Sequence, residues 1–312
     1  MRNYILSISI LFTISCETIV ELDMPIHQPV IVLNSTLEPD SVCNVFLSHS
    51  RGAFDENIIN TIKDANVTLS YEDLSFDLHQ DSIVDYSEVT YYYTHPNKLI
   101  SSLEYDIEVN HSDYKSVFSS TRIPQNINLL NYEINSFDTT ELRPTRLKLH
   151  FIDNTNEDNY YRIRLFAPIE YEDGDYYWDD KWSQYDFNKF VKYTEIELYS
   201  NDPSLSDGSI PWEGYSFTGS EAFFTDDLFD GEQKELVFDL DLDLNNFAAG
   251  DSLFLEFTSF SEDAYNYMYS VRRSQNSFVS PFGTEPVSIY SNIENGIGIF
   301  MGANILDTLL VP

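Results

Sequence analysis

The chain has 312 residues, with 52 acidic against 17 basic side chains and a formal net charge of −35. This charge argues against binding to nucleic acid, because phosphate contacts need Lys and Arg side chains. Hydrophobic residues make up 42% of the chain and aromatic residues 15%, which is more than an intrinsically disordered chain carries. We therefore expect an ordered, strongly acidic protein, long enough for two domains.

Residues 1–15 have the layout of a signal peptide. Arg2 supplies a positive charge, and an apolar stretch from Ile5 to Ile14 follows it, too short for a membrane-spanning helix of ~20 residues. Cys16 comes next, in an arrangement that resembles the lipobox of bacterial lipoproteins. We expect cleavage before Cys16 and acylation of its thiol, with residues 16–25 as an acylated tether. The alternative is an ordinary signal peptide with an incidental cysteine.

Three acidic residues, Glu17, Glu21 and Asp23, lie just after this cysteine. They resemble the signal that sends Bacteroidota lipoproteins to the outside of the cell. The resemblance implies a protein that is lipid-anchored in the outer membrane and exposed at the cell surface.

Residues 26–124 show the period-two pattern of short, half-buried strands. The spacing between their turn residues predicts an immunoglobulin- or transthyretin-like β-sandwich. Cys43 lies within one of these segments and is expected to be a buried, inert thiol. The segments that alternate are 29–38, 44–50, 66–72, 105–111 and 116–123.

Residues 125–312 are predicted to form a larger β-sandwich domain with one short helix. Its strands are expected at 145–151, 160–166, 193–199, 235–244 and 251–259. The helix is predicted at 261–273, where Ser261 can cap the first turn and Ala264, Met268 and Val271 share one face. The fold class is therefore all-β.

Two acidic stretches, 171–182 and 223–232, combine carboxylates with glycine and aromatic residues. Carboxylate oxygens at this density suit Ca²⁺, and exposed tryptophans suit a sugar or a protein interface. The alternative is an acidic surface loop with its aromatic residues folded underneath. The candidate interface or ligand residues are Asp173, Asp175, Trp178, Asp179, Asp180, Trp182, Asp226 and Asp227. No other cofactor is expected.

A third acidic stretch, DLDLDL at 239–244, lacks the Gly and Glu that an EF-hand loop requires at its sixth and twelfth positions. We interpret it as the end of a strand with its carboxylates on one solvated face.

The C-terminal stretch 280–304 is rich in Gly, Asn and aromatic residues. Residues 287–293 alternate like a strand, and the pair Asn295-Gly296 predicts a hairpin turn into a following strand. Glycine also lets a ligand approach the backbone, so a ligand-contact role for 290–292 stays open. The residues of interest are Tyr290, Ser291, Asn292, Asn295, Gly296, Gly298 and Phe300.

Together with the stretch that begins at Cys16, this C-terminal motif resembles a family of Bacteroidota outer-membrane lipoproteins known only as a domain of unknown function. Genes of that family often lie beside TonB-dependent receptors that carry a carboxypeptidase-regulatory-like domain. The resemblance covers nearly the whole mature chain and brings no catalytic residues with it. It implies a non-enzymatic accessory subunit of an outer-membrane complex, with a β-barrel protein, a TonB-dependent receptor, as partner.

The sequence shows no catalytic motif. Its six histidines are scattered, and there is no HExxH, GxSxG or P-loop pattern. Two alternatives to the accessory subunit remain: a free-standing lipoprotein that binds a glycan or Ca²⁺, and a hydrolase with a pair of carboxylates.

Overall fold

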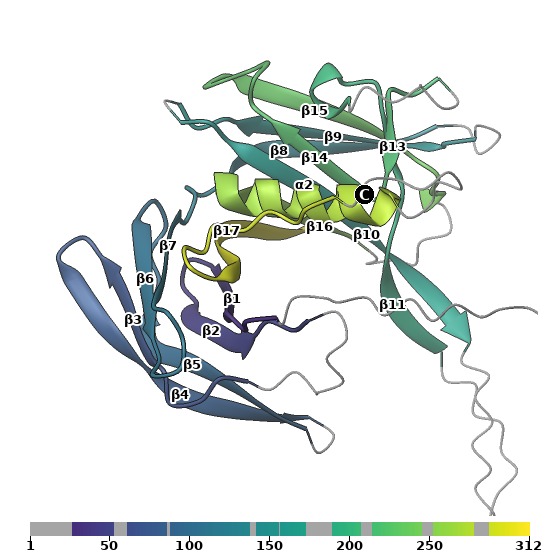
Figure 1. Cartoon of the computed structure of the whole chain (residues 1–312). Helices are drawn as coiled ribbons and strands as arrows, with labels where there is room; N and C mark the ends of the chain where they lie inside the picture. The colour runs from purple at the N-terminus through teal and green to yellow at the C-terminus, as the bar shows by residue number, and fades with distance from the viewer. Residues whose placement is uncertain are drawn as a thin grey trace, which may run out of the picture.

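The computed structural model shows an almost entirely β-stranded protein (Figure 1), which confirms the expected fold class. It describes residues 27–52, 61–85, 88–137, 142–155, 157–172, 189–206, 214–244, 252–277 and 287–312. The signal peptide, Cys16 and the tether up to residue 25 lie outside the described residues, as does most of the acidic stretch 171–182. Among the described residues, no helix has the length and apolar character needed to cross a bilayer.

The first half of the described chain contains seven strands that pair largely in a meander. Their bounds are β1 Ile31–Leu37, β2 Val42–His49, β3 Asn66–Tyr71, β4 Leu74–Asp85, β5 Glu88–Lys98, β6 Glu104–Asn110 and β7 Val117–Arg122. Inward-facing residues of these strands form one buried cluster that includes Leu33, Val45, Val67 and Ile107. Because β1 and β2 share this core with β3 and β6, the seven strands fold over one another as a sandwich.

The second half contains the remaining strands, a short 3₁₀ turn and one α-helix. Their bounds are β8 Asn128–Ser136, β9 Thr145–Ile152, β10 Tyr160–Glu172, β11 Lys189–Glu195, β12 Leu198–Ser200, η1 Pro203–Leu205, β13 Phe217–Gly219, β14 Glu221–Thr225, β15 Gln233–Leu240, β16 Leu253–Phe260, α2 Glu262–Ser277 and β17 Ile297–Leu310. Five of these strands form a separate sheet in the order β13-β12-β15-β9-β8, at the top of the view in Figure 1.

The core of this half lies between that five-stranded sheet and the strands β10, β14 and β16. Alternate residues of each strand point inward, as the period-two pattern predicts. Leu147, Phe151 and Phe238 come from one side, and Ile163 and Phe257 from the other. The ring of Phe151 contacts that of Phe257 edge to face, with their centres 5.1 Å apart.

The last strand, β17, joins the two halves into one twelve-stranded sheet. Its first part, from Ile297 to Gly302, runs parallel to β1, and its second part, from Ala303 to Leu310, pairs antiparallel with β16. Two residues of the C-terminal region, Ile293 and Phe300, belong to the core of the first half. β17 belongs to the second half of the chain but pairs with β1 of the first half, so the two halves share one sheet. The proposed domain division at residue 124 stays a prediction.

The predicted helix is present, and it ends four residues later than expected, at Ser277. Its start agrees with the prediction, because the Ser261 hydroxyl accepts a hydrogen bond from the Ala264 amide at 3.2 Å. Ala264 is fully buried against Met301 and Ala303 of β17. The helix thus packs on the sheet where β17 crosses between the halves (Figure 1).

One local prediction is wrong, and another holds only in part. Residues 287–293 form no strand, so the turn at Asn295 does not close a hairpin. Their polar groups bond to α2, β7 and β17 without forming a regular strand ladder. The strand that enters DLDLDL ends at Leu240. Up to that residue the predicted alternation holds, because Phe238 and Leu240 are buried and Asp239 lies on the opposite face of β15. Asp239 is less exposed there than expected, because it binds Arg146 at 2.6 Å.

Candidate functional site

The C-terminal motif forms hydrogen bonds with three elements, α2, β7 and β17. Both amide atoms of Asn292 bond to the backbone of Phe300 in β17, with Nδ2 donating to the carbonyl oxygen at 2.7 Å and Oδ1 accepting from the amide at 3.0 Å. The Ser119 hydroxyl of β7 donates to the Asn292 carbonyl at 2.9 Å. Asn295, with a positive φ of 60°, donates to the carbonyl of Ser116. We call residues 290–302 the clasp.

Tyr290 links the clasp to the helix. Its hydroxyl donates to Asp263 in the first turn of α2 at 2.5 Å, and its amide donates to the Ser270 hydroxyl. Burial, together with the bond to Asp263, raises the pKa of Tyr290 to about 12. The polar groups of Tyr290, Asn292 and Asn295 are therefore used within the chain, which supports a structural role for the motif.

The glycines of the clasp allow backbone to touch backbone. A Cβ atom at Gly298, where φ is +114°, would lie 2.0 Å from the carbonyl oxygen of Leu33, and one at Gly302 would lie 2.0 Å from that of Arg122. Real side chains do not approach so closely, so only glycine fits. Glycine can leave room for a ligand beside the backbone, but here that room is taken up by β1 and β7 of the chain itself.

The acidic stretch 223–232 contributes to a cluster of three carboxylates. Asp226 lies beside Asp153 and Asp230, with one carboxylate oxygen of each residue within 4.8 Å of the others. Asp153 is 2% exposed and Asp226 is 4% exposed. Asp227, the other residue predicted from this stretch, is exposed and accepts a hydrogen bond from Thr225.

Both buried carboxylates of this cluster have hydrogen-bond donors. Asp153 accepts from the Tyr161 hydroxyl at 2.6 Å and from the Gly231 amide at 2.7 Å. Asp226 accepts from the backbone and side-chain nitrogens of Asn159. Burial nevertheless raises the pKa of both carboxyls, and the charge of Asp153 adds to the rise at Asp226. A divalent cation would relieve this repulsion.

The remaining residues predicted for the acidic loops lie outside the described residues. These are Asp173, Asp175, Trp178, Asp179, Asp180 and Trp182.

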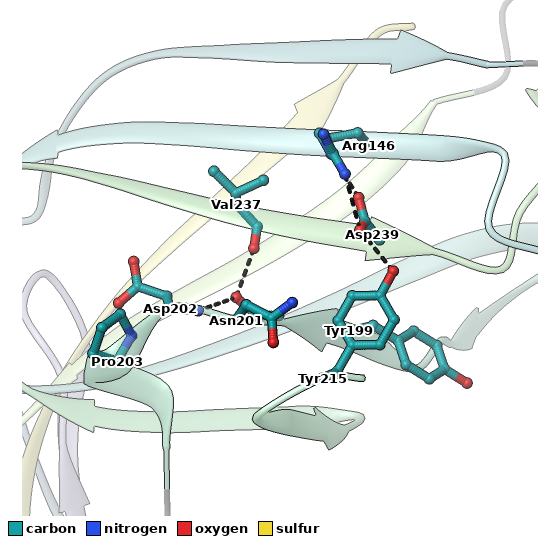
Figure 2. A pocket seen from close by; sticks show the side chains of 9 residues that line it. Arg146, Tyr199, Asn201, Asp202, Pro203, Tyr215, Val237 and Asp239 are labelled. Atoms are coloured by element: carbon teal, nitrogen blue, oxygen red, sulfur yellow. Dashed lines mark hydrogen bonds and ion pairs between the residues drawn. The ribbon is translucent and has the colours of Figure 1, made fainter. Parts of the chain in front are cut away.

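The described residues also form a pocket of about 360 Å³ on the five-stranded sheet. Figure 2 shows Asp202 and Pro203 on one side of it, Arg146, Asp239 and Tyr215 on the other, and Asn201 between them. β12 and the turn after it provide one wall, and β15 and β9 provide the floor and the far wall.

Two ion pairs fix the polar walls of this pocket. Asp239 binds the Nε atom of Arg146 and accepts from the Tyr215 hydroxyl at 2.7 Å. Asp202 binds the ammonium group of Lys234 at 2.8 Å. Burial alone would raise the pKa of either carboxyl, but the hydrogen bonds from these partners outweigh it and lower both values. Both carboxyl groups therefore stay ionised, and the negative charge of each is balanced by its ion-pair partner.

Sequence reasoning did not find this pocket. Its residues come from β9, β12, β15 and the segment before β13, which are distant in the chain. Several of these residues lie in predicted strands, but only Asp239 lies in a stretch that was weighed as a possible binding site, and there it was expected on a solvated strand face.

The hairpin of β4 and β5 was also not predicted, and it carries an exposed apolar tip. Ile83, Val84 and Val89 are 51%, 68% and 44% exposed. Val84 pairs with Val89 across the hairpin, and Ile83 pairs with Thr90. Because neighbouring residues of a strand point to opposite faces, the tip is apolar on both faces. No single core can cover both.

The hairpin tip lies at the end of the sheet where the described chain begins. Ile31, the first residue of β1, pairs with His49 at the end of β2. β2 runs antiparallel to β5, with Val45 opposite Tyr93, so the end of β2 points toward Val89. Figure 1 shows β4 and β5 as a long ribbon pair along the lower edge of the molecule.

Comparison with protein-family profiles places the chain in a family. Residues 17–308 match the family described as Domain of unknown function (DUF4249). Since the match spans most of the chain, the protein belongs to this family. A search of curated proteins finds no match.

Proposed function

We propose that the protein is a lipid-anchored, surface-exposed lipoprotein of the outer membrane. In this role it is a non-enzymatic accessory subunit that docks on a β-barrel partner, a TonB-dependent receptor. One observation carries the proposal: the apolar β4–β5 tip and the start of the described chain lie at the same end of the sheet. A tether from Cys16 therefore leads to the end of the molecule that offers an apolar contact.

The length of the tether suits such a contact. The twelve residues 17–28, which include the tether after Cys16 and lead to the first sandwich, reach ~40 Å at full extension. This is enough to hold the first sandwich against the outer loops of a barrel. Lasting anchorage needs two or more acyl chains, and a lipoprotein cysteine carries them.

The chemistry of the tip favours a protein partner over the lipid surface itself. An exposed carboxylate, that of Asp81, lies two residues before Ile83 and on the same face of β4. Carboxylates are repelled by anionic headgroups and are costly in hydrocarbon. An apolar tip rimmed by charge is typical of a protein interface.

The experiment is purification of the tagged protein from its own membranes, comparing wild type with a variant that carries Ile83→Thr, Val84→Thr and Val89→Thr. Threonine keeps the β-branched shape and removes apolar surface. We expect a β-barrel protein to co-purify in stoichiometric amount with the wild type. If each residue loses roughly 1 kcal/mol of burial, the variant binds about a hundredfold more weakly.

A matched control is Val42→Thr. Val42 is another exposed valine of the same sandwich, and it pairs with Lys98 at the end of β5 that is remote from the tip. The proposal is wrong if no barrel protein co-purifies with the wild type, or if the tip variant retains it as well as the control does.

A second candidate function, calcium binding, is favoured by the cluster of Asp153, Asp226 and Asp230. If this cluster binds Ca²⁺, millimolar Ca²⁺ should raise the melting temperature and EDTA should reverse the effect, because a ligand of the folded state stabilises it. Asp226→Asn should abolish the rise, while Asp227→Asn should keep it. If neither Ca²⁺ nor EDTA changes the melting temperature, calcium binding by this cluster is wrong.

A further inference from the structure

The pocket on the five-stranded sheet has the composition of a ligand site in a place that the docking proposal does not use. It lies in the second half of the chain, whereas the hairpin tip lies in the first. Its volume of about 360 Å³ is at the small end of the ~300–1,000 Å³ that ligand pockets span. That size suits one or two rings of a small polar ligand rather than a long segment of polymer.

The charge balance of the pocket limits the class of ligand. The protein as a whole carries a charge of −35, yet each carboxylate that lines the pocket has its own cation, Arg146 for Asp239 and Lys234 for Asp202. The guanidinium group of Arg143 also lies over the Tyr199 and Tyr215 rings, 3.6 Å and 4.9 Å from their centres. An anionic ligand would meet two fixed carboxylates, and a cationic ligand would meet three built-in cations. A neutral ligand meets neither obstacle.

The remaining polar groups can both donate and accept hydrogen bonds. The Oδ1 atom of Asn201 accepts from the Ser216 amide at 3.0 Å, so its Nδ2 group is the part that can donate to a ligand. The three hydrogen bonds to Asp202 all end on Oδ1, which leaves Oδ2 as an acceptor. A donor and an acceptor at separate places along the wall suit separate hydroxyl groups of one ligand.

Aromatic and apolar surface completes the site. The ring of Tyr215 lies beside that of Tyr199, with their centres 5.5 Å apart, and its hydroxyl is held by Asp239. Pro203 on the opposite rim and Val237 on the floor add apolar contact. A sugar ring has the same combination, with C–H groups on its faces and hydroxyl groups around its edge.

We propose that the pocket lined by Arg146, Asn201, Asp202, Tyr215 and Asp239 binds one or two rings of a neutral saccharide. Asn201 and Asp202 hold the hydroxyl groups, and Tyr215 and Pro203 hold the apolar faces. The ion pair of Arg146 with Asp239 fixes the position of Tyr215.

The test is saturation-transfer NMR on the purified full-length protein. The probes are glucose, galactose, mannose, xylose, fucose, N-acetylglucosamine, and α- and β-linked disaccharides of the hexoses. Glucuronate and glucosamine serve as charged comparisons. We expect saturation transfer to at least one neutral sugar and weaker transfer to both charged sugars.

The matched variants are Asn201→Asp and Asn128→Asp. The first keeps the oxygen that accepts from Ser216 but replaces the Nδ2 donor with a charged acceptor, and the second makes the same change at an exposed position on β8. Asn201→Asp should weaken sugar binding at least about tenfold with an unchanged melting temperature, and Asn128→Asp should leave binding intact.

Three results would overturn the proposal: no transfer to any neutral sugar, stronger transfer to a charged sugar, or equal binding by both variants. Because the experiment uses the isolated protein, its failure is separate from a failure of barrel docking.

Discussion

Asp153 and Asp226 show how single residues are held in an unfavourable electrostatic state. Both carboxylates are buried close together, and burial raises the pKa of each. The hydrogen bonds from Asn159 and Tyr161 offset only part of this cost. In the metal-free protein the carboxylates of Asp153 and Asp226 therefore repel each other when both are ionised.

In metal-free protein we predict that Asp226→Asn raises the free energy of unfolding at neutral pH. The asparagine oxygen can accept both bonds from Asn159, and the repulsion from Asp153 disappears. A carboxyl whose folded pKa is raised makes the fold less stable as pH rises from the unfolded toward the folded pKa. The gain from Asp226→Asn should therefore shrink as pH falls through the folded pKa. Urea unfolding between pH 3 and 7 measures it, and a gain that grows toward acid pH contradicts the prediction.

Asp239 should behave in the opposite way. Its pKa is lowered overall, because bonds from Arg146 and Tyr215 outweigh burial. A lowered folded pKa contributes stability above the unfolded pKa, and this stability is lost as pH falls through the folded value. We predict that Asp239→Asn destabilises the protein at neutral pH and that the difference from wild type narrows in acid. The same urea series provides the measurement, and a difference that persists unchanged at pH 3 contradicts it.

Among the elements, β17 holds the fold together, since it pairs with β1 and β16 and lies under α2. Its contact with β7 is direct at Gly302, where a Cβ atom would lie 2.0 Å from the Arg122 carbonyl oxygen. The same glycine exchanges two hydrogen bonds with Ser261, the residue that caps the helix. Strand, helix and first sandwich therefore meet at one point.

We predict that Gly302→Ala costs about 2–4 kcal/mol of stability, because backbone must move to admit the methyl group. Gly219→Ala is the matched control: its Cβ atom would meet only the Phe217 ring, at 3.6 Å, and should cost no more than about 1 kcal/mol. Chemical unfolding compares the two. Equal stability of both variants would show that the clasp is not tightly packed.

Ser261→Ala tests the same junction from the helix side. The hydroxyl accepts from Ala264 and from Gly302 in β17, and it also bonds to Thr121 of β7. Loss of a cap costs typically ~1 kcal/mol, and two further buried partners lose a bond. We expect Ser261→Ala to lower the free energy of unfolding by about 2 kcal/mol in total, as measured by chemical unfolding. A loss below about 0.5 kcal/mol would contradict a role at this junction.

The sequence predicted those elements whose signal is local. The alternation in 145–151 and 160–166 identified β9 and β10, and Ser261 marked the start of the helix. It could not predict the parallel pairing of β17 with β1, since these strands lie at opposite ends of the chain. Residues 287–293 alternate like a strand but are held by side-chain bonds such as those of Asn292. The pocket, built from four separate segments, left no local pattern.

At the scale of the whole molecule, the proposed docking tip lies near the first described residues of the chain. The described chain starts at the end of the first sandwich that carries Ile83, Val84 and Val89. The clasp joins this sandwich to the second half. A partner that holds the tip would therefore also position the pocket on the five-stranded sheet.

Cys16→Ser tests the anchor. We expect the variant to be released from the membrane or to keep residues 1–15, because serine cannot take the thioether-linked lipid. Mass spectrometry and membrane fractionation provide the measurement, and protease added to intact cells tests exposure of the wild type. Normal processing and membrane retention of the variant would contradict acylation, and a protease-resistant wild type would place the protein on the periplasmic side.

The most direct test of docking is photo-crosslinking on intact cells, with a photoreactive residue at Val84 of the hairpin tip or, as control, at Val42. Both valines are exposed in the isolated chain, and they lie toward opposite ends of β5. We predict that the probe at Val84 forms an adduct with an outer-membrane β-barrel protein and that the probe at Val42 does not. An absence of barrel adducts at Val84, or identical adducts from both positions, would contradict it.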